Sequence, residues 1–136
     1  MLHRLILLVR HLRSVVFFKK SIRFLLVFLM FSGAWVATRK LDIPSTYQLS
    51  DKLVHVIVFL GFAVLIDLSG SRKPFLLWKG LPLLIYGICI EIMQYFTPER
   101  SFSMFDWGAD LAGILLYLIT KKFILWLDSK KDDHLL

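Results

Sequence analysis

Four long apolar runs, separated by short charged segments, constrain the fold of this chain more than any other feature. They cover residues 22–38, 53–68, 75–96 and 104–127. A helix of about 20 residues crosses the hydrocarbon core of a bilayer, with about 17 residues as the lower bound. None of the four runs alternates between polar and apolar residues, as membrane-spanning strands do. Hydrophobic residues make up 57% of the chain, against about 45–50% in soluble domains. The sequence therefore predicts an all-α membrane protein with four transmembrane helices.

The first 21 residues differ from these runs, because basic residues interrupt the apolar ones: Arg4, Arg10, Arg13, Lys19 and Lys20. No Ala-x-Ala-like cleavage site follows a short apolar core, so we do not expect a secretory signal peptide. The pattern predicts an N-terminal amphipathic interfacial helix, whose cations face the anionic headgroups of the inner membrane surface. The expected organisation is this basic segment over 1–21, a four-helix membrane domain over 22–127 and a cytoplasmic tail over 128–136.

The distribution of lysine and arginine predicts the orientation in the membrane. Thirteen of the 17 lie in or near the N-terminal segment, the loop between the second and third runs, or the tail. The opposite side has the remaining four, Arg39, Lys40, Lys52 and Arg100. Because cytoplasmic segments carry the excess of positive charge, we expect the N-terminus and the C-terminus in the cytoplasm.

The net charge of +7 raises the question of a nucleic-acid partner. A nucleic-acid binder usually shows one continuous basic face, whereas here the basic residues form short clusters between apolar runs. Cys89 is the only cysteine, which rules out an internal disulfide framework and a zinc site built from cysteines. We therefore expect the lipid bilayer as a partner, and no nucleic acid.

The sequence makes a specific prediction for each of three residues near the predicted inner ends of the helices. Pro82 is expected either in the first turn of the third helix or at a kink within it. Lys79 is long enough to reach the inner membrane surface. Asp67, at the end of the second run, is expected to be solvated.

Most other polar residues of the membrane domain fall at one depth, near the predicted outer ends of the helices. They form three pairs at helical spacing: Asp51/His55, Glu91/Gln94 and Asp106/Asp110. Each pair shares one face of its helix. A carboxylate within an apolar run costs free energy when it faces lipid, so these groups are expected to turn inward. With Arg100 and Ser103 of the outer loop, they predict an outward-opening polar pocket.

These polar residues, taken in order along the chain, also follow a known pattern. The elements are Asp51-Lys52-x-x-His55, Glu91-x-x-Gln94, Arg100-Ser101-x-Ser103-x-x-Asp106 and Gly113. The ordered set resembles the VanZ-like family of small bacterial membrane proteins, over about half of the chain, residues 49–118. The usual residue of the family at the position of Asp110 is asparagine, so this chain adds a potential negative charge there.

The resemblance implies a multi-pass protein of the bacterial cytoplasmic membrane. The founding member of the family is linked to low-level resistance to teicoplanin, a glycopeptide that binds cell-wall precursors. The expected function is to bind or modify an anionic envelope lipid or a lipid-linked cell-wall precursor in the outward-facing pocket. The candidate catalytic residues are His55, Glu91, Asp106 and Asp110. The candidate ligand-binding residues are Asp51, Gln94, Arg100 and Ser103.

Several alternatives stay open from the sequence alone. The carboxylates and Arg100 could form a purely structural network. The chain could be a non-enzymatic module that docks another membrane protein, or a proton-coupled carrier, for which four helices are few. His55 is expected either to bond Asp51 in a structural role, or to carry a proton or bind a metal with Glu91 or Asp110 as its partner. One histidine with several carboxylates suits Mn, Mg or Zn only loosely, and the sequence names no cofactor.

Overall fold

The computed structural model describes residues 2–39, 48–70, 73–98 and 102–133, with side chains over 14–39, 51–70, 73–98 and 102–130. Four α-helices make up nearly all of this part: α1 (Leu2–Ala37), α2 (Gln48–Leu68), α3 (Leu81–Tyr95) and α4 (Met104–Asp133). A π-helical turn, η2 (Leu76–Gly80), leads directly into α3. No strand occurs within these ranges, so the prediction of an all-α fold is confirmed.

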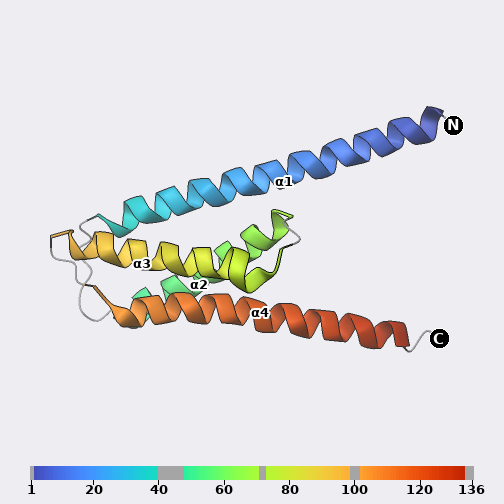
Figure 1. Ribbon diagram of the computed structural model, residues 1–136. Helices are drawn as coiled ribbons and strands as arrows, with labels where there is room; N and C mark the ends of the chain where they lie inside the picture. Colours follow the sequence, from blue (N-terminus) through green and yellow to red (C-terminus); the bar gives the residue numbers. More distant parts are fainter. Residues whose placement is uncertain (1, 40–47, 71–72, 99–101, 134–136) are drawn as a thin grey trace.

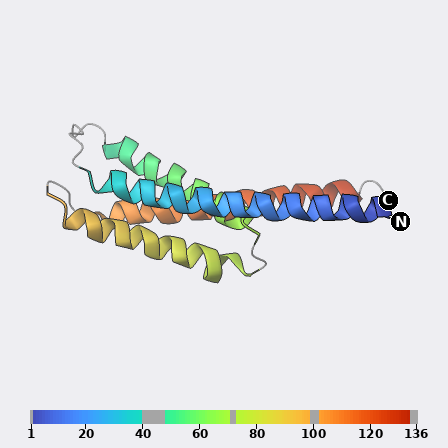
Figure 2. The ribbon, with the colours of Figure 1, turned by 90° about the horizontal axis from the view of Figure 1, so that it is seen from above.

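The helices lie side by side, and α1 and α4 are much longer than α2 and α3 (Figure 1). Seen from above, α2 and α3 flank α1 and α4 on opposite sides (Figure 2). At about 1.5 Å per residue, α1 and α4 measure roughly 54 and 45 Å. Both extend past α2 and α3 at the same end, where both chain termini lie (Figure 1).

The interfacial helix predicted over 1–21 is not a separate element. α1 continues without a break from Leu2 to Ala37, through the boundary that the sequence placed at residues 21 and 22. The predicted boundary followed the charge pattern, but lysine and arginine are good helix formers and the boundary has neither Gly nor Pro. Over its whole length α1 does not separate polar and apolar residues onto opposite faces. The tail predicted over 128–136 is likewise helical as far as Asp133.

α2 is the central helix of the bundle. Its interface with α4 is the largest between two elements, and it also contacts α1, α3 and η2. Gly113 of α4 permits the close approach, because a Cβ there would meet the carbonyl oxygen of Val56 and would lie 3.0 Å from the Leu60 nitrogen. The buried apolar core comes from all four helices: Leu26, Phe59, Phe62, Ala63, Leu83 and Ile114.

The entry into α3 distinguishes between the two predictions for Pro82. The backbone N–H of Leu81 donates to the carbonyl of Leu76, five residues back, which defines the π-helical turn. Pro82 is near the start of α3, but the π-helical turn precedes it with helical backbone, and the two elements form one helix of 20 residues, Leu76–Tyr95. Pro82 therefore lies within a continuous helix, as the second alternative placed it, and the kink stays a prediction.

The outer surface of the bundle is rich in large apolar side chains. Phe24 and Phe31 of α1 and Phe105 of α4 are each more than 70% exposed, and exposed apolar residues also occur on α2 and α3. By length and composition, Leu76–Tyr95 is the one helix within the described ranges that could cross a membrane. α2 carries three charged residues near its two ends, Asp51, Lys52 and Asp67, which shorten its uninterrupted apolar stretch.

Candidate functional site

The candidate site lies at the end of the bundle opposite to the chain termini, where α2 and α4 begin and α3 ends (Figure 1). We call it the His55 cluster, and its members are Asp51, Lys52, His55, Glu91, Ser103, Asp106 and Asp110. Glu91 and Asp110 are completely buried and Asp106 is nearly so. The prediction that Glu91 and Asp110 turn into the protein is therefore confirmed, and Asp106 is buried as well.

A short contact between His55 and Asp110 joins α2 to α4 in this cluster. Nδ1 of His55 lies 2.8 Å from Oδ1 of Asp110. This bond holds the imidazole ring in place and leaves Nε2 for another partner. The hydrogen-bond partner of His55 is thus Asp110 and not Asp51. Asp110 was one of the two carboxylates expected if His55 carries a proton or binds a metal.

Gly87 of α3 makes the position of Asp110 possible. A Cβ on Gly87 would collide with Oδ2 of Asp110 and would lie 3.3 Å from the ring of Phe59. Any larger side chain at this position would therefore displace the carboxylate that holds His55. Sequence reasoning missed Gly87, because a single glycine in an apolar helix carries no signal of what lies on the next helix.

Lys52 supplies the permanent positive charge of the cluster. Its Nζ lies 2.8 Å from Oδ1 of Asp106, and the two side chains are 39% and 12% exposed. Lys52 lies just before the span predicted over 53–68. Its hydrogen bond to Asp106 raises the pKa of its ammonium group above the usual value. The resemblance motif contained Lys52, but it was not among the candidate site residues.

Glu91 connects α3 to the start of α4. Its Oε2 accepts a hydrogen bond of 2.8 Å from the backbone N–H of Ser103. The hydroxyl of Ser103 accepts one of 3.3 Å from the backbone N–H of Asp106, which is an N-cap for α4. Ser103 thus serves helix capping through its side chain. The second oxygen of Glu91, Oε1, is buried and has no hydrogen-bond partner in the described structure.

Three side chains of the cluster have a geometry that could hold a metal ion. One ligand atom from each of Asp51, His55 and Asp106 lies within 4.8 Å of the others. Asp51 and His55 come from one face of α2, as their i,i+4 spacing predicted, and Asp106 comes from the first turn of α4. Carboxylate and imidazole groups together suit Mn²⁺ and Zn²⁺.

One predicted site residue, Gln94, does not contact the cluster, and the structure does not describe a second, Arg100. Gln94 is buried, but its Nε2 donates to the carbonyl of Ala37 at 3.3 Å. It therefore satisfies the last turn of α1, which lacks helical partners, and its predicted role in ligand binding has no contact to support it. Arg100 lies outside the described residues, so its predicted place in the pocket stays a prediction.

A second polar cluster, which we call the Asp67 cluster, lies where α2 ends and η2 begins. Asp67 accepts hydrogen bonds from Lys79, Tyr117 and Lys121, the last at 2.6 Å. Lys79 is 3% exposed. The predictions that Asp67 is solvated and that Lys79 reaches the membrane surface are therefore wrong. The two side chains pair because the turn before η2 brings the ends of two helices together.

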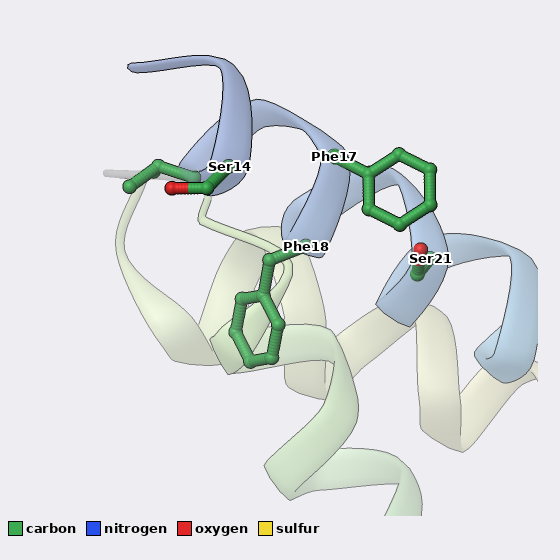
Figure 3. Close-up of a pocket in the computed structure, with 5 residues that line it drawn as sticks. Ser14, Phe17, Phe18 and Ser21 are labelled. Carbon is green, nitrogen blue, oxygen red and sulfur yellow. The ribbon is translucent and has the colours of Figure 1, made fainter. Parts of the chain in front are cut away.

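An open hollow on α1 is separate from both clusters. It is lined by Ser14, Val15, Phe17, Phe18 and Ser21, and Figure 3 shows the two phenylalanine rings on different sides of the helix. Its walls are mostly apolar and include no carboxylate or histidine. The hollow therefore belongs to the apolar exterior and offers no group for acid–base chemistry.

Comparison with known proteins returns no match: no family model fits the chain, and no curated protein or solved structure is similar to it.

Proposed function

We propose that this chain is a multi-pass protein of the bacterial cytoplasmic membrane whose His55 cluster binds or modifies an anionic envelope lipid or a lipid-linked cell-wall precursor. The membrane assignment is supported by the apolar exterior, because exposed apolar surface of this extent marks contact with lipid or with a partner. In this proposal all four helices span the bilayer, and the charged residues near the ends of α2 lie at the two interfaces.

The proposed orientation places the His55 cluster at the outer surface. The ends of α1 and α4 that extend past the bundle carry basic residues, among them Arg4, Arg10, Lys130 and Lys131. Excess lysine and arginine favour the cytoplasmic side. Both termini are then cytoplasmic, and the His55 cluster, at the other end of the bundle, faces the outside.

The chemistry rests on one observation, the bond between His55 and the buried Asp110. A histidine whose Nδ1 is held by a carboxylate presents Nε2 as a proton acceptor in a fixed direction. The carboxylate also stabilises the imidazolium that forms when Nε2 takes a proton. In the proposal, His55 activates a hydroxyl, an amine or water at a lipid headgroup. The resemblance to the VanZ-like family favours the envelope as the setting, with reduced susceptibility to teicoplanin as a phenotype to measure. It does not extend to the dyad, because the family usually has asparagine at the position of Asp110.

A cysteine-labelling experiment tests the orientation. Thr46→Cys and Ser129→Cys are made separately in a Cys89→Ala background, because Cys89 is exposed. Ser129 is also exposed, whereas Ser69, in the loop on the same side, is buried. An impermeant maleimide is expected to label Thr46→Cys in intact cells, and Ser129→Cys only after the membrane is opened. Labelling of Ser129→Cys in intact cells would show the orientation to be wrong.

Lipid analysis of the purified protein tests the function. We expect the wild-type protein in mild detergent to retain an anionic lipid or a lipid-linked precursor, identified by native mass spectrometry. Asp110→Asn is expected to weaken retention, because the variant no longer fixes an imidazolium at His55. Asp128→Asn, the same change at an exposed site, is the control. Equal retention by wild type and Asp110→Asn would argue that the dyad does not serve the ligand.

A further inference from the structure

We propose that Asp51, His55 and Asp106 form a binding site for one divalent cation, of the class that accepts imidazole and carboxylate ligands together, such as Mn²⁺ or Zn²⁺. The site is a property of the chain itself. A cation can be bound and measured without added lipid, but an ion on Nε2 of His55 would prevent that nitrogen from acting as the base of the proposed lipid function, so the two roles of Nε2 are alternatives.

The geometry of the three side chains supports coordination by two helices. Their ligand atoms lie within 4.8 Å of one another, a separation that one central ion can bridge with bonds of about 2.0–2.2 Å after small side-chain rotations. Asp51 and His55 are one helical turn apart on α2, and Asp106 opens α4. A bound ion would therefore join the starts of the two helices that share the largest interface.

The bond between His55 and Asp110 prepares the imidazole for a metal. Histidines that bind metals usually donate their other ring N–H to a carboxylate or a carbonyl group, which fixes the ring and increases its basicity. Here Nδ1 is 2.8 Å from Asp110 Oδ1, so Nε2 is assigned to the cation. Asp110 is then a positioning residue for the ligand and does not itself contact the ion.

The charge balance of the cluster favours a bound cation. Among the described residues, the salt bridges of its four carboxylates, on Asp51, Glu91, Asp106 and Asp110, are those of Asp106 with Lys52 and of Asp110 with the titratable His55. Lys52 pairs with Asp106 from a partly exposed position. Its long side chain can move to solvent when a divalent ion approaches the same carboxylate. Carboxylates that are buried without enough positive charge are costly, and a divalent ion removes this excess.

Glu91 provides an independent indication of a missing partner. Its side chain has no exposure, and Oε1 makes no hydrogen bond within the described ranges. Buried polar atoms in native proteins almost always have a partner. The bond from Ser103 N–H to Oε2 turns this carboxylate toward the start of α4, where it interacts electrostatically with Asp106 and His55. Glu91 is not among the residues whose ligand atoms lie within 4.8 Å of one another, so a water bound to the cation, and not the cation itself, would be the partner of Oε1.

Titration of the purified full chain with Mn²⁺ in detergent tests the site, followed by electron paramagnetic resonance of the free ion. We expect one Mn²⁺ per wild-type chain, and Zn²⁺ to displace it. His55→Gln and Asp106→Asn should each weaken binding at least tenfold. Asp51→Asn, at a half-buried position, should do the same with the least effect on folding, which circular dichroism checks. Asp128→Asn, the matched change at an exposed carboxylate, should bind as the wild type does.

The variant Lys52→Gln tests whether the cluster is a cation site or a purely structural network. Since Lys52 competes with the ion for Asp106, its removal should tighten Mn²⁺ binding several-fold, whereas loss of a merely structural ion pair would leave binding unchanged or weaker. Absence of saturable Mn²⁺ and Zn²⁺ binding by the wild type, or equal binding by Asp51→Asn and Asp128→Asn, would overturn the proposal. Because no lipid is added, failure here leaves the lipid function to its own test.

Discussion

The His55 cluster and the Asp67 cluster are both made of charged groups inside an apolar bundle, but they differ in how fully those groups are paired. Both oxygens of Asp67 accept hydrogen bonds, and the two lysines that donate to them outnumber the single carboxylate. In the His55 cluster, by contrast, Oε1 of Glu91 has no partner in the described structure, and carboxylates outnumber the lysine. A network in which the carboxylate is fully paired, such as the Asp67 cluster, holds helices together. A network with an unpaired oxygen, such as the His55 cluster, can still bind a ligand.

The position of each cluster agrees with this difference. The Asp67 cluster joins α2 to η2 and to α4, and nearby Arg23 of α1 donates to the carbonyl of Ser69 at 3.0 Å. It thus ties every helix of the bundle at one level. The His55 cluster lies at the other end of the bundle, where α2 and α4 begin and α3 ends. We expect substitutions in the Asp67 cluster to affect stability first, and those in the His55 cluster to affect ligand binding first.

The largest effect is expected for Asp67→Asn. The substitution removes the carboxylate that pairs with Lys79, which is 3% exposed, and breaking a buried ion pair by removing one partner costs about 3–5 kcal/mol. Unfolding in detergent, followed by circular dichroism, should show this loss in the free energy of unfolding.

Asp128→Asn is the control for that measurement, because it makes the same chemical change at an exposed position. A change within about 0.5 kcal/mol is typical of such surface sites. If Asp67→Asn were as stable as this control, the Asp67 cluster would not stabilise the fold, and the proposed difference between the two clusters would be wrong.

A smaller loss of stability is expected for Gly87→Ala. Its new Cβ would displace Oδ2 of Asp110 and press on the ring of Phe59, and overpacking of this kind costs about 1–3 kcal/mol. Because the displaced carboxylate holds His55, Mn²⁺ binding should weaken in the same variant. Thermal unfolding and Mn²⁺ titration measure the two effects.

Gly61→Ala is the matched control, since a Cβ at Gly61 meets nothing within 4 Å. Alanine has the higher helix propensity, by about 1 kcal/mol, so this variant should be at least as stable as the wild type. Equal stability of Gly87→Ala and Gly61→Ala would mean that Asp110 does not need the space at Gly87.

The sequence predicted local features of this molecule well and contacts between distant residues poorly. Helical spacing placed Asp51 with His55 and Asp106 with Asp110, because i,i+4 neighbours share a face whatever the tertiary structure. The partner of His55 could not be chosen, since Asp110 is 55 residues away along the chain.

The same limit explains the errors at the other end of the bundle. Asp67 looked like a solvated end residue because the lysines that pair with it lie 12 and 54 positions further along the chain. The break predicted before residue 22 was a local error of a different kind. A change from charged to apolar residues alters where a helix lies, but it does not end the helix, which needs Gly, Pro or a cap.

The smallest effect on stability, with an opposite effect on binding, is expected for Glu91→Gln. The amide oxygen of Gln can still accept the bond from Ser103 N–H, so the link between α3 and α4 is kept. The variant removes a buried negative charge, and its NH2 group replaces an acceptor that has no partner in the described structure. Replacing an unpaired buried charge by a neutral group should therefore leave the free energy of unfolding unchanged or raise it, by less than about 1 kcal/mol.

Mn²⁺ binding should nevertheless weaken, because Glu91 no longer adds its negative charge beside the ion. A stable variant with weaker binding would identify Glu91 as a residue kept for the ligand at the expense of stability. If Glu91→Gln instead lost stability as Asp67→Asn is expected to do, the His55 cluster would be a second structural network, and the difference between the two ends of the bundle would disappear.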